Sequence, residues 1–306
     1  MATPSRPSLR MRWLPLLVLV LLAAALPLGT AAAQAPAAKS ILNVPFKGVA
    51  APASTFDLVE SIIDFNPGST SHVITTGMPH YLSVLSGELT VTVDGDAQTV
   101  VAAKGVAVPA GAKLTLANTS TSPAARLFVS TLVEVGAVTD VHLLSPAGVK
   151  VFATARRTMS NAPGVVDVVQ MAAVYDVGYR TANHVMNEFH LMIHLSGKIG
   201  YAYLDGGAES YGPGSQAAMY EGRPGWMRND GPDASSMAWT WVGTPGKPLS
   251  SAVPATNPPA PPNTGTSLAQ DRTAITATLA ATALVLAILG ASALAAMSAR
   301  RNPPAR

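Results

Sequence analysis

The chain has 306 residues, a net charge of +3 and no cysteine. Without cysteine it can form no disulfide and offers no thiol nucleophile. The positive charge lies at the ends, because residues 1–33 and residues 273–306 each hold three arginines and no acidic residue. The middle of the chain is therefore mildly acidic, which excludes a broad attraction to nucleic acid.

The first 33 residues have the pattern of a secretory signal peptide. Arg6, Arg10 and Arg12 precede an apolar run over residues 13–28, and alanines at 31–33 offer a cleavage site before Gln34. No cysteine follows, so the usual bacterial lipoprotein anchor is excluded. We expect the chain to be exported.

Short apolar runs separated by Gly, Pro, Asn and Asp fill the middle of the chain. Examples are residues 85–93, 100–108, 127–135 and 165–174, which read as strands bounded by turns. Asp94-Gly95 and Asp205-Gly206 are hairpin signals, because glycine tolerates the positive φ of tight turns. No long segment here shows a helical period, so the pattern predicts an all-β barrel or sandwich.

One spacing of five residues occurs twice, 110 residues apart. The two copies are Gly68, Ile74, Thr76, His80 and Gly87, and Gly178, His184, Met186, His190 and Gly197. A repeat of this length is two copies of a whole domain. We therefore expect one domain at 41–136 and a second at 139–244.

The repeated spacing resembles the first motif of the cupins, Gly-x5-His-x-His-x3,4-Glu-x6-Gly. A second cupin motif, with Pro-x-Gly followed by His and Asn, has counterparts at Pro109-Ala110-Gly111 with Asn118, and at Gly222 with Asn229. The resemblance implies two tandem cupin-like jelly-roll β-barrels, a bicupin arrangement, over about residues 41–244. Cupins often dimerise through sheet faces, so it also implies a homo-oligomer as one alternative.

The resemblance also implies a metal centre, but most of its ligands are replaced. The four family positions hold Ile74, Thr76, His80 and Leu114 in the first copy, and His184, Met186, His190 and Gly225 in the second. A catalytic metal site needs about three protein ligands. We therefore expect no cofactor, with a divalent ion (Fe, Mn, Zn, Ni or Cu) held by His184 and His190 as the alternative.

Residues near His190 predict a ligand pocket in the second domain. On a strand, His190, Met192 and His194 share one face, yet about 13 Å separates His190 from His194, too far for one ion. The pocket candidates are Met186, Met192, His194, Tyr203 and Arg223, with His80 at the matching place in the first domain. Such a pocket suits a small organic or sugar-like ligand. For Trp239 and Trp241 the alternative is core packing.

The C-terminal segment predicts surface attachment. A proline-rich stalk over 250–272 contains Pro-Pro-Asn-Thr-Gly, which resembles the sortase signal Leu-Pro-x-Thr-Gly with Pro261 in place of Leu. A sortase would cleave between Thr264 and Gly265; the alternative is an ordinary stalk. The uncharged residues 273–299 predict a transmembrane helix, and the basic tail at 300–306 predicts a cytoplasmic C-terminus.

These patterns favour an exported, surface-anchored bicupin that acts as a non-catalytic ligand-binding or structural module. Its expected partners are the membrane, a small ligand and a sortase. One alternative is a metal-dependent enzyme of dioxygenase, isomerase or decarboxylase type that uses His184 and His190. Another is a surface scaffold or adhesion protein.

Overall fold

The computed structural model describes residues 35–139, 146–219 and 221–254. The predicted signal peptide, sortase-like motif with Thr264 and Gly265, membrane span and basic tail lie outside these ranges. So does the stalk beyond Pro254. Within the described ranges, no helix is long and apolar enough to cross a membrane.

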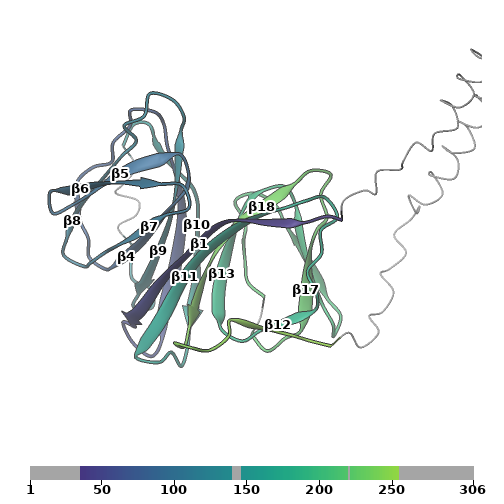
Figure 1. Ribbon diagram of the computed structural model, residues 1–306. Helices are drawn as coiled ribbons and strands as arrows, with labels where there is room; N and C mark the ends of the chain where they lie inside the picture. Colours follow the sequence, from purple (N-terminus) through teal and green to yellow (C-terminus); the bar gives the residue numbers. More distant parts are fainter. Residues whose placement is uncertain (1–34, 140–145, 220, 255–306) are drawn as a thin grey trace, which may run out of the picture. The chain divides into compact units, whose positions relative to one another are not determined.

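The described chain is all-β, as the turn and strand pattern predicts, with four antiparallel sheets that form two barrels (Figure 1). The first barrel has a five-stranded sheet in the order β10-β2-β9-β4-β7 and a four-stranded sheet in the order β3-β8-β5-β6. The second has the five-stranded sheets β1-β11-β18-β13-β16 and β15-β14-β17-β12-β19.

The strands of the first barrel are β10 (Val149–Met159), β2 (Phe56–Phe65), β9 (Ala125–Val133), β4 (His80–Ser86), β7 (Gly105–Val108), β3 (Ile74–Thr75), β8 (Lys113–Ala117), β5 (Glu88–Val93) and β6 (Asp96–Val101). The strands of the second are β1 (Ala38–Ala50), β11 (Val165–Tyr175), β18 (Ser235–Gly243), β13 (Phe189–Ser196), β16 (Gln216–Ala217), β15 (Ala208–Tyr211), β14 (Ile199–Tyr203), β17 (Gly225–Asn229), β12 (His184–Met186) and β19 (Ser250–Ala252).

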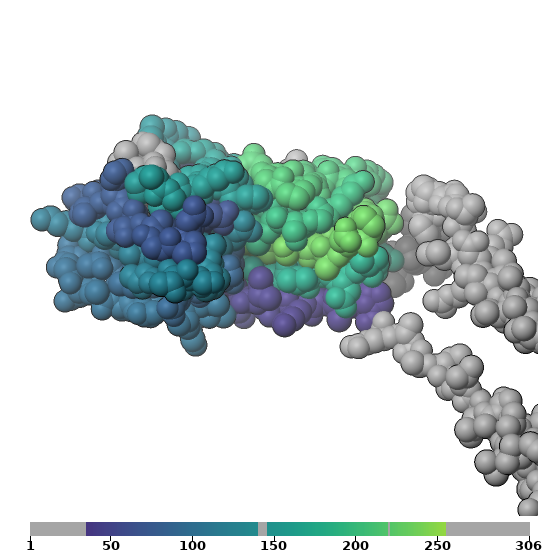
Figure 2. Space-filling model, turned by 90° about the horizontal axis from the view of Figure 1, so that it is seen from above, coloured from purple at the N-terminus to yellow at the C-terminus, as the bar shows by residue number. Residues whose placement is uncertain are grey.

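The two barrels exchange their first strands. β1 pairs with β11 of the second barrel, from Ala38 opposite Tyr175 to Ala50 opposite Val165. β10 pairs with β2 of the first barrel, from Val149 opposite Phe65 to Met159 opposite Phe56. In Figure 1, β1 accordingly runs beside β11, and in Figure 2 the purple N-terminal residues lie against the green half. The predicted domains at 41–136 and 139–244 divide the chain in sequence order. In the structure, β1 and β10 instead each belong to the large sheet of the other barrel.

Three apolar clusters fill the structure, and strand alternation decides which cluster each residue joins. On β2, Ile63 and Phe65 point into the first barrel, while Leu58 and Ile62 join a cluster shared between the barrels. The shared cluster also takes Leu191 from β13, so the large sheets of the two barrels pack face to face. The third cluster lies inside the second barrel.

A buried polar network lies within this otherwise apolar interface. The Gln170 side chain accepts a hydrogen bond from the Ser83 hydroxyl (2.5 Å) and donates to the Tyr81 carbonyl (2.9 Å) and to Ser130 Oγ (2.7 Å). Ser130 Oγ and Thr240 Oγ1 lie 2.6 Å apart. Ser130 and Thr240 occupy the same place in the two repeats, because 110 positions separate them. This bond therefore lies at the centre of the pseudo-symmetric pair of barrels.

Glu60 occupies in the first repeat the place that Gln170 occupies in the second. Its side chain is fully buried, and neither carboxyl oxygen has a hydrogen-bond partner of good geometry within the described part of the chain. Burial raises the pKa of Glu60 well above its usual range, although Thr240 acts in the opposite direction. Burial in the interface therefore favours the neutral form of Glu60.

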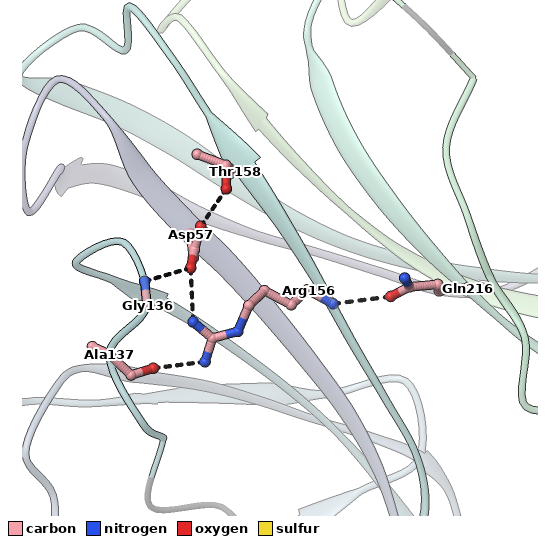
Figure 3. Close-up of polar contacts among 6 residues, drawn as sticks. All are labelled: Asp57, Gly136, Ala137, Arg156, Thr158 and Gln216. Atoms are coloured by element: carbon pink, nitrogen blue, oxygen red, sulfur yellow. Dashed lines mark hydrogen bonds and ion pairs between the residues drawn. The ribbon is translucent and has the colours of Figure 1, made fainter.

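An ion pair ties the exchanged strand β10 to the first barrel (Figure 3). Asp57 on β2 accepts hydrogen bonds from the Gly136 backbone N–H (2.9 Å), the Thr158 hydroxyl (2.6 Å) and the Arg156 guanidinium (2.7 Å). Burial raises the pKa of Asp57, but these bonds outweigh it and leave the pKa below its usual value. The Arg156 backbone N–H donates to Gln216 on β16 (3.1 Å), so the same residue also contacts the second barrel.

The other exchanged strand has a weaker counterpart of this pair. Lys47 Nζ on β1 lies 2.7 Å from Asp167 Oδ2, and the Gly48 N–H donates to Asp167 Oδ1 (3.0 Å). The Lys47 side chain is 67% exposed, against 37% for Arg156. Solvent therefore screens the pair on β1 more strongly than the pair on β10.

Candidate functional site

A cavity of about 290 Å³ lies inside the second barrel. β13 forms one wall, since its alternation turns His190 and Met192 into the barrel while Leu191 and Ile193 face the first barrel. The cavity is lined by Met171, Tyr175, Thr181, His184, Met186, His190, Met192, Tyr201, Met219, Met227, Met237, Trp239, Trp241, Leu249 and Ser250. It is small for a ligand site, since such pockets usually hold 300–1,000 Å³.

Methionine dominates this lining. Six of the eleven methionines in the chain line the cavity, from Met171 on β11 to Met237 on β18. The segment of the first repeat, residues 41–136, has only Met78. Thioether side chains are flexible and polarizable, so this wall can adapt to the shape of an apolar ligand.

His190 presents a neutral imidazole to the cavity. Its Nε2 accepts a hydrogen bond from the Met219 backbone N–H (3.1 Å), and its ring packs on Trp241 with the centroids 4.6 Å apart. Nδ1 has no hydrogen-bond partner of good geometry among the described residues. Burial lowers the pKa of His190 to about 4, a shift that Glu221 partly opposes and Arg157 reinforces.

Arg157 connects the exchanged strand β10 to this site. It donates to the backbone carbonyl of His190 (2.9 Å), pairs with both carboxylate oxygens of Glu221 (2.8 Å each) and lies 4.5 Å from the centre of the Phe189 ring. β10 belongs to the sheet of the first barrel. A residue of the first sheet thus fixes the backbone beneath the cavity of the second barrel.

His184 and His190 both line the cavity, as a shared site would require. His184 Nδ1 lies 2.8 Å from the Ala182 carbonyl, so it carries the proton and Nε2 presents a lone pair. His190 Nε2, however, is occupied by the Met219 N–H. No group of three or more His, Cys, Asp or Glu side chains in the described ranges could hold a metal ion. This donor set does not fit the divalent centre that the cupin resemblance implies.

His194 lies behind the cavity wall. Its Nδ1 donates to the Ser215 carbonyl (3.2 Å), and its Nε2 lies 3.1 Å from the Tyr201 hydroxyl. The ring stacks on Tyr211, with the centroids 5.3 Å apart and the planes inclined by 7°. Burial lowers the pKa of His194 to about 4, although the hydrogen bond to the Ser215 carbonyl acts to raise it.

The remaining predicted site residues lie at different places. Tyr203 belongs to the apolar cluster of the second barrel, and the Arg223 guanidinium lies 3.7 Å from its ring centre. Arg223 also forms two hydrogen bonds of 2.8 Å with Asp205, so it is part of a surface ion pair and not of the cavity wall. Trp239 and Trp241, for which core packing was the alternative, both line the cavity.

Apolar side chains fill the corresponding region of the first barrel. Ile74 and Leu114, at two of the four family metal positions, are buried members of its core cluster. The Thr76 hydroxyl donates to the Pro109 carbonyl (2.7 Å). His80 is buried on β4 at the parity of Leu82, which belongs to that core cluster. In the first barrel, these positions are therefore buried in or beside a packed apolar core.

One solved structure supports the fold that this geometry defines. Vicilin from Solanum melongena matches with a TM-score of 0.50 at 9% identity, over 64% of this chain and 77% of that chain. Vicilin from Capsicum annuum (TM-score 0.49, 10% identity, 64% and 78%) and oxalate decarboxylase from Bacillus subtilis (0.47, 11%, 70% and 80%) are also similar. No protein-family model and no curated protein sequence matches the chain.

The fold of this chain is thus similar to that of the vicilin from Solanum melongena. More particularly, the chain carries two β-barrels in tandem, as the repeated spacing predicts. At 9% identity the match defines the fold alone.

Proposed function

We propose that this chain is an exported bicupin whose second barrel binds a small apolar molecule. The observation that carries the proposal is the lining of the 290 Å³ cavity, in which six methionines and four aromatic side chains surround two imidazoles. A ligand site of this kind combines apolar walls with a few polar groups that fix orientation. Here those groups are His184, Thr181 and Ser250.

The lining favours an aromatic or other apolar ligand over a sugar. A sugar would bury several hydroxyls, and each would need a hydrogen-bond partner or cost free energy. The imidazole Nε2 of His190 already accepts a bond from the backbone of Met219. His184 Nε2 is then the nitrogen best placed to accept a hydrogen bond from a ligand hydroxyl or N–H group.

The same cavity favours a binding module over a metal-dependent enzyme. A third ligand for His184 and His190 does not occur among the described His, Cys, Asp and Glu side chains. The scaffold alternative draws no support from the shared apolar cluster, because that surface is already buried between the two barrels of one chain.

Titration calorimetry with 1-naphthol tests the proposal, because this compound has an apolar ring system and one hydroxyl. We expect saturable binding to the chain and at least about tenfold weaker binding after Met171→Trp, which places a larger ring in the cavity. Met78→Trp is the matched control, since Met78 is also half-buried but belongs to the first repeat. Absence of binding, or equal loss in both variants, would contradict the proposal.

The location outside the cell rests on the terminal sequence patterns. A protease added to intact cells should digest the barrels and leave a C-terminal tag protected if residues 273–299 span the membrane. Replacing Thr264 and Gly265 should leave this pattern unchanged if the helix is retained. The same change should prevent attachment to the wall if a sortase uses the motif.

A further inference from the structure

The Tyr201 hydroxyl contacts three electron-pair donors. Met192 Sδ and Met237 Sδ each lie 3.4 Å from Tyr201 Oη, and His194 Nε2 lies 3.1 Å from it. All four residues are buried, with Met192 and His194 on β13, Tyr201 on β14 and Met237 on β18. The hydroxyl has one hydrogen, so it can donate a full hydrogen bond to only one of the three at a time.

His194 is fixed in the form that a metal ligand requires. Its Nδ1 donates to the Ser215 carbonyl, which leaves the lone pair of Nε2 directed toward Tyr201. Metal-binding histidines usually donate their second ring N–H to a backbone carbonyl or carboxylate in this way, because the bond sets the tautomer and the ring orientation. The stacked ring of Tyr211 restricts the imidazole further.

The three donors are soft, and none of them carries a charge. Thioether sulfur and imidazole suit Cu(I), whereas Mg²⁺, Ca²⁺ and Mn²⁺ prefer carboxylate, carbonyl and water oxygens. The methionine-rich wall adds a second soft feature, since Met186, Met219 and Met227 line the same cavity. The first repeat has no such wall, because Leu82 and Leu127 occupy the places of Met192 and Met237 in its core cluster.

We propose that Met192, Met237 and His194 form a binding site for Cu(I). The ion would lie among the two sulfurs and Nε2, and the Tyr201 hydroxyl would turn its hydrogen toward the cavity. No proton is released and no electron is transferred, because both thioethers and the neutral imidazole already present lone pairs. This site uses none of the four cupin metal positions and does not depend on the apolar ligand proposed above.

The test is a competition between the full chain and the Cu(I) chelator bicinchoninate, under nitrogen with ascorbate. We expect one Cu(I) per chain, and at least about tenfold weaker binding after Met192→Leu or Met237→Leu, which keep the side-chain volume but remove the sulfur. Met171→Leu is the matched control, because Met171 lines the same cavity, whereas the sulfurs at hydrogen-bond distance from Tyr201 Oη are those of Met192 and Met237. Copper X-ray absorption should show sulfur together with nitrogen as the nearest atoms.

A second variant separates metal binding from simple packing. Tyr201→Phe removes the hydroxyl that competes for the lone pairs of the three donors, so Cu(I) affinity should be kept or increased. Absence of Cu(I) binding in the folded chain, or equal affinity in the Met192, Met237 and Met171 variants, would overturn the proposal. Since 1-naphthol binding is measured on metal-free protein, either proposal can fail while the other stands.

Discussion

Replacing Glu60 with glutamine should change how the stability of the chain depends on pH. Glu60 is fully buried between the barrels, and burial raises the pKa of its carboxyl well above its usual range. Gln170, at the same place in the second repeat, shows that an amide fits such a position, since it makes three hydrogen bonds there. The Glu60→Gln variant should therefore keep the fold while removing a titrating group.

The expected size follows from proton linkage. Above the ordinary pKa of 4.5, the unfolded chain releases the Glu60 proton while the folded chain retains it. The free energy of unfolding therefore falls by about 1.4 kcal/mol for each pH unit. This fall begins near 4.5 and ends at the raised pKa of the folded state. Below this window Glu60 contributes no pH dependence.

Urea unfolding of wild type and variant, followed by tryptophan fluorescence over about pH 4.5–8, measures this effect. The difference in unfolding free energy, variant minus wild type, should rise by about 1.4 kcal/mol per pH unit within the window. His190 and His194 titrate in both proteins, so their contributions cancel in the difference. A difference that does not change with pH would refute the assignment of Glu60 as a neutral buried acid. Gln170→Glu is the reverse control and should steepen the fall.

Two further predictions use matched pairs of positions. Arg156→Met should lower the unfolding free energy by about 1–2 kcal/mol, because it leaves the buried carboxylate of Asp57 without its charged partner. Lys47→Met should lower it by less than about 1 kcal/mol, because the Lys47 side chain is more exposed to solvent. Equal losses in urea unfolding would contradict the difference in burial. Gly197→Ala should cost about 2 kcal/mol or more, because φ is +68° and a Cβ would lie 2.7 Å from Ser235 Cα. At Gly206, φ is +91° and a Cβ would meet no atom, so Gly206→Ala should cost only the backbone strain. Similar thermal midpoints for the Gly197→Ala and Gly206→Ala variants would refute the steric clash with Ser235.

The sequence predicts the barrels well because the relevant signals are local. Alternating apolar residues and Asp-Gly turns define strands and hairpins, and the 110-residue repeat defines two units. The same alternation predicts the orientation of His190 and Met192 toward the inside of the second barrel, where the structure has them. The loss of the family metal ligands is also visible directly, as Ile74 and Leu114 show.

The strand exchange and the site around Tyr201 could not be predicted in the same way. A strand pattern for residues 38–50 says nothing about its partner, and β11 lies more than 100 residues away. The contacts of Tyr201 join β13, β14 and β18, which only the barrel brings together. One signal was available for the cavity, since methionines cluster between Met171 and Met237 and are almost absent from the first repeat.

The exchange of β1 and β10 makes each half of the chain a donor to the other. If the two halves were produced as separate polypeptides, each would lack an outer strand of its own large sheet and carry one that fits its partner. An unpaired edge of this kind readily recruits another chain. The halves should therefore behave as complementary fragments that assemble when mixed, and a single half expressed alone should form a reciprocal dimer with its own copy.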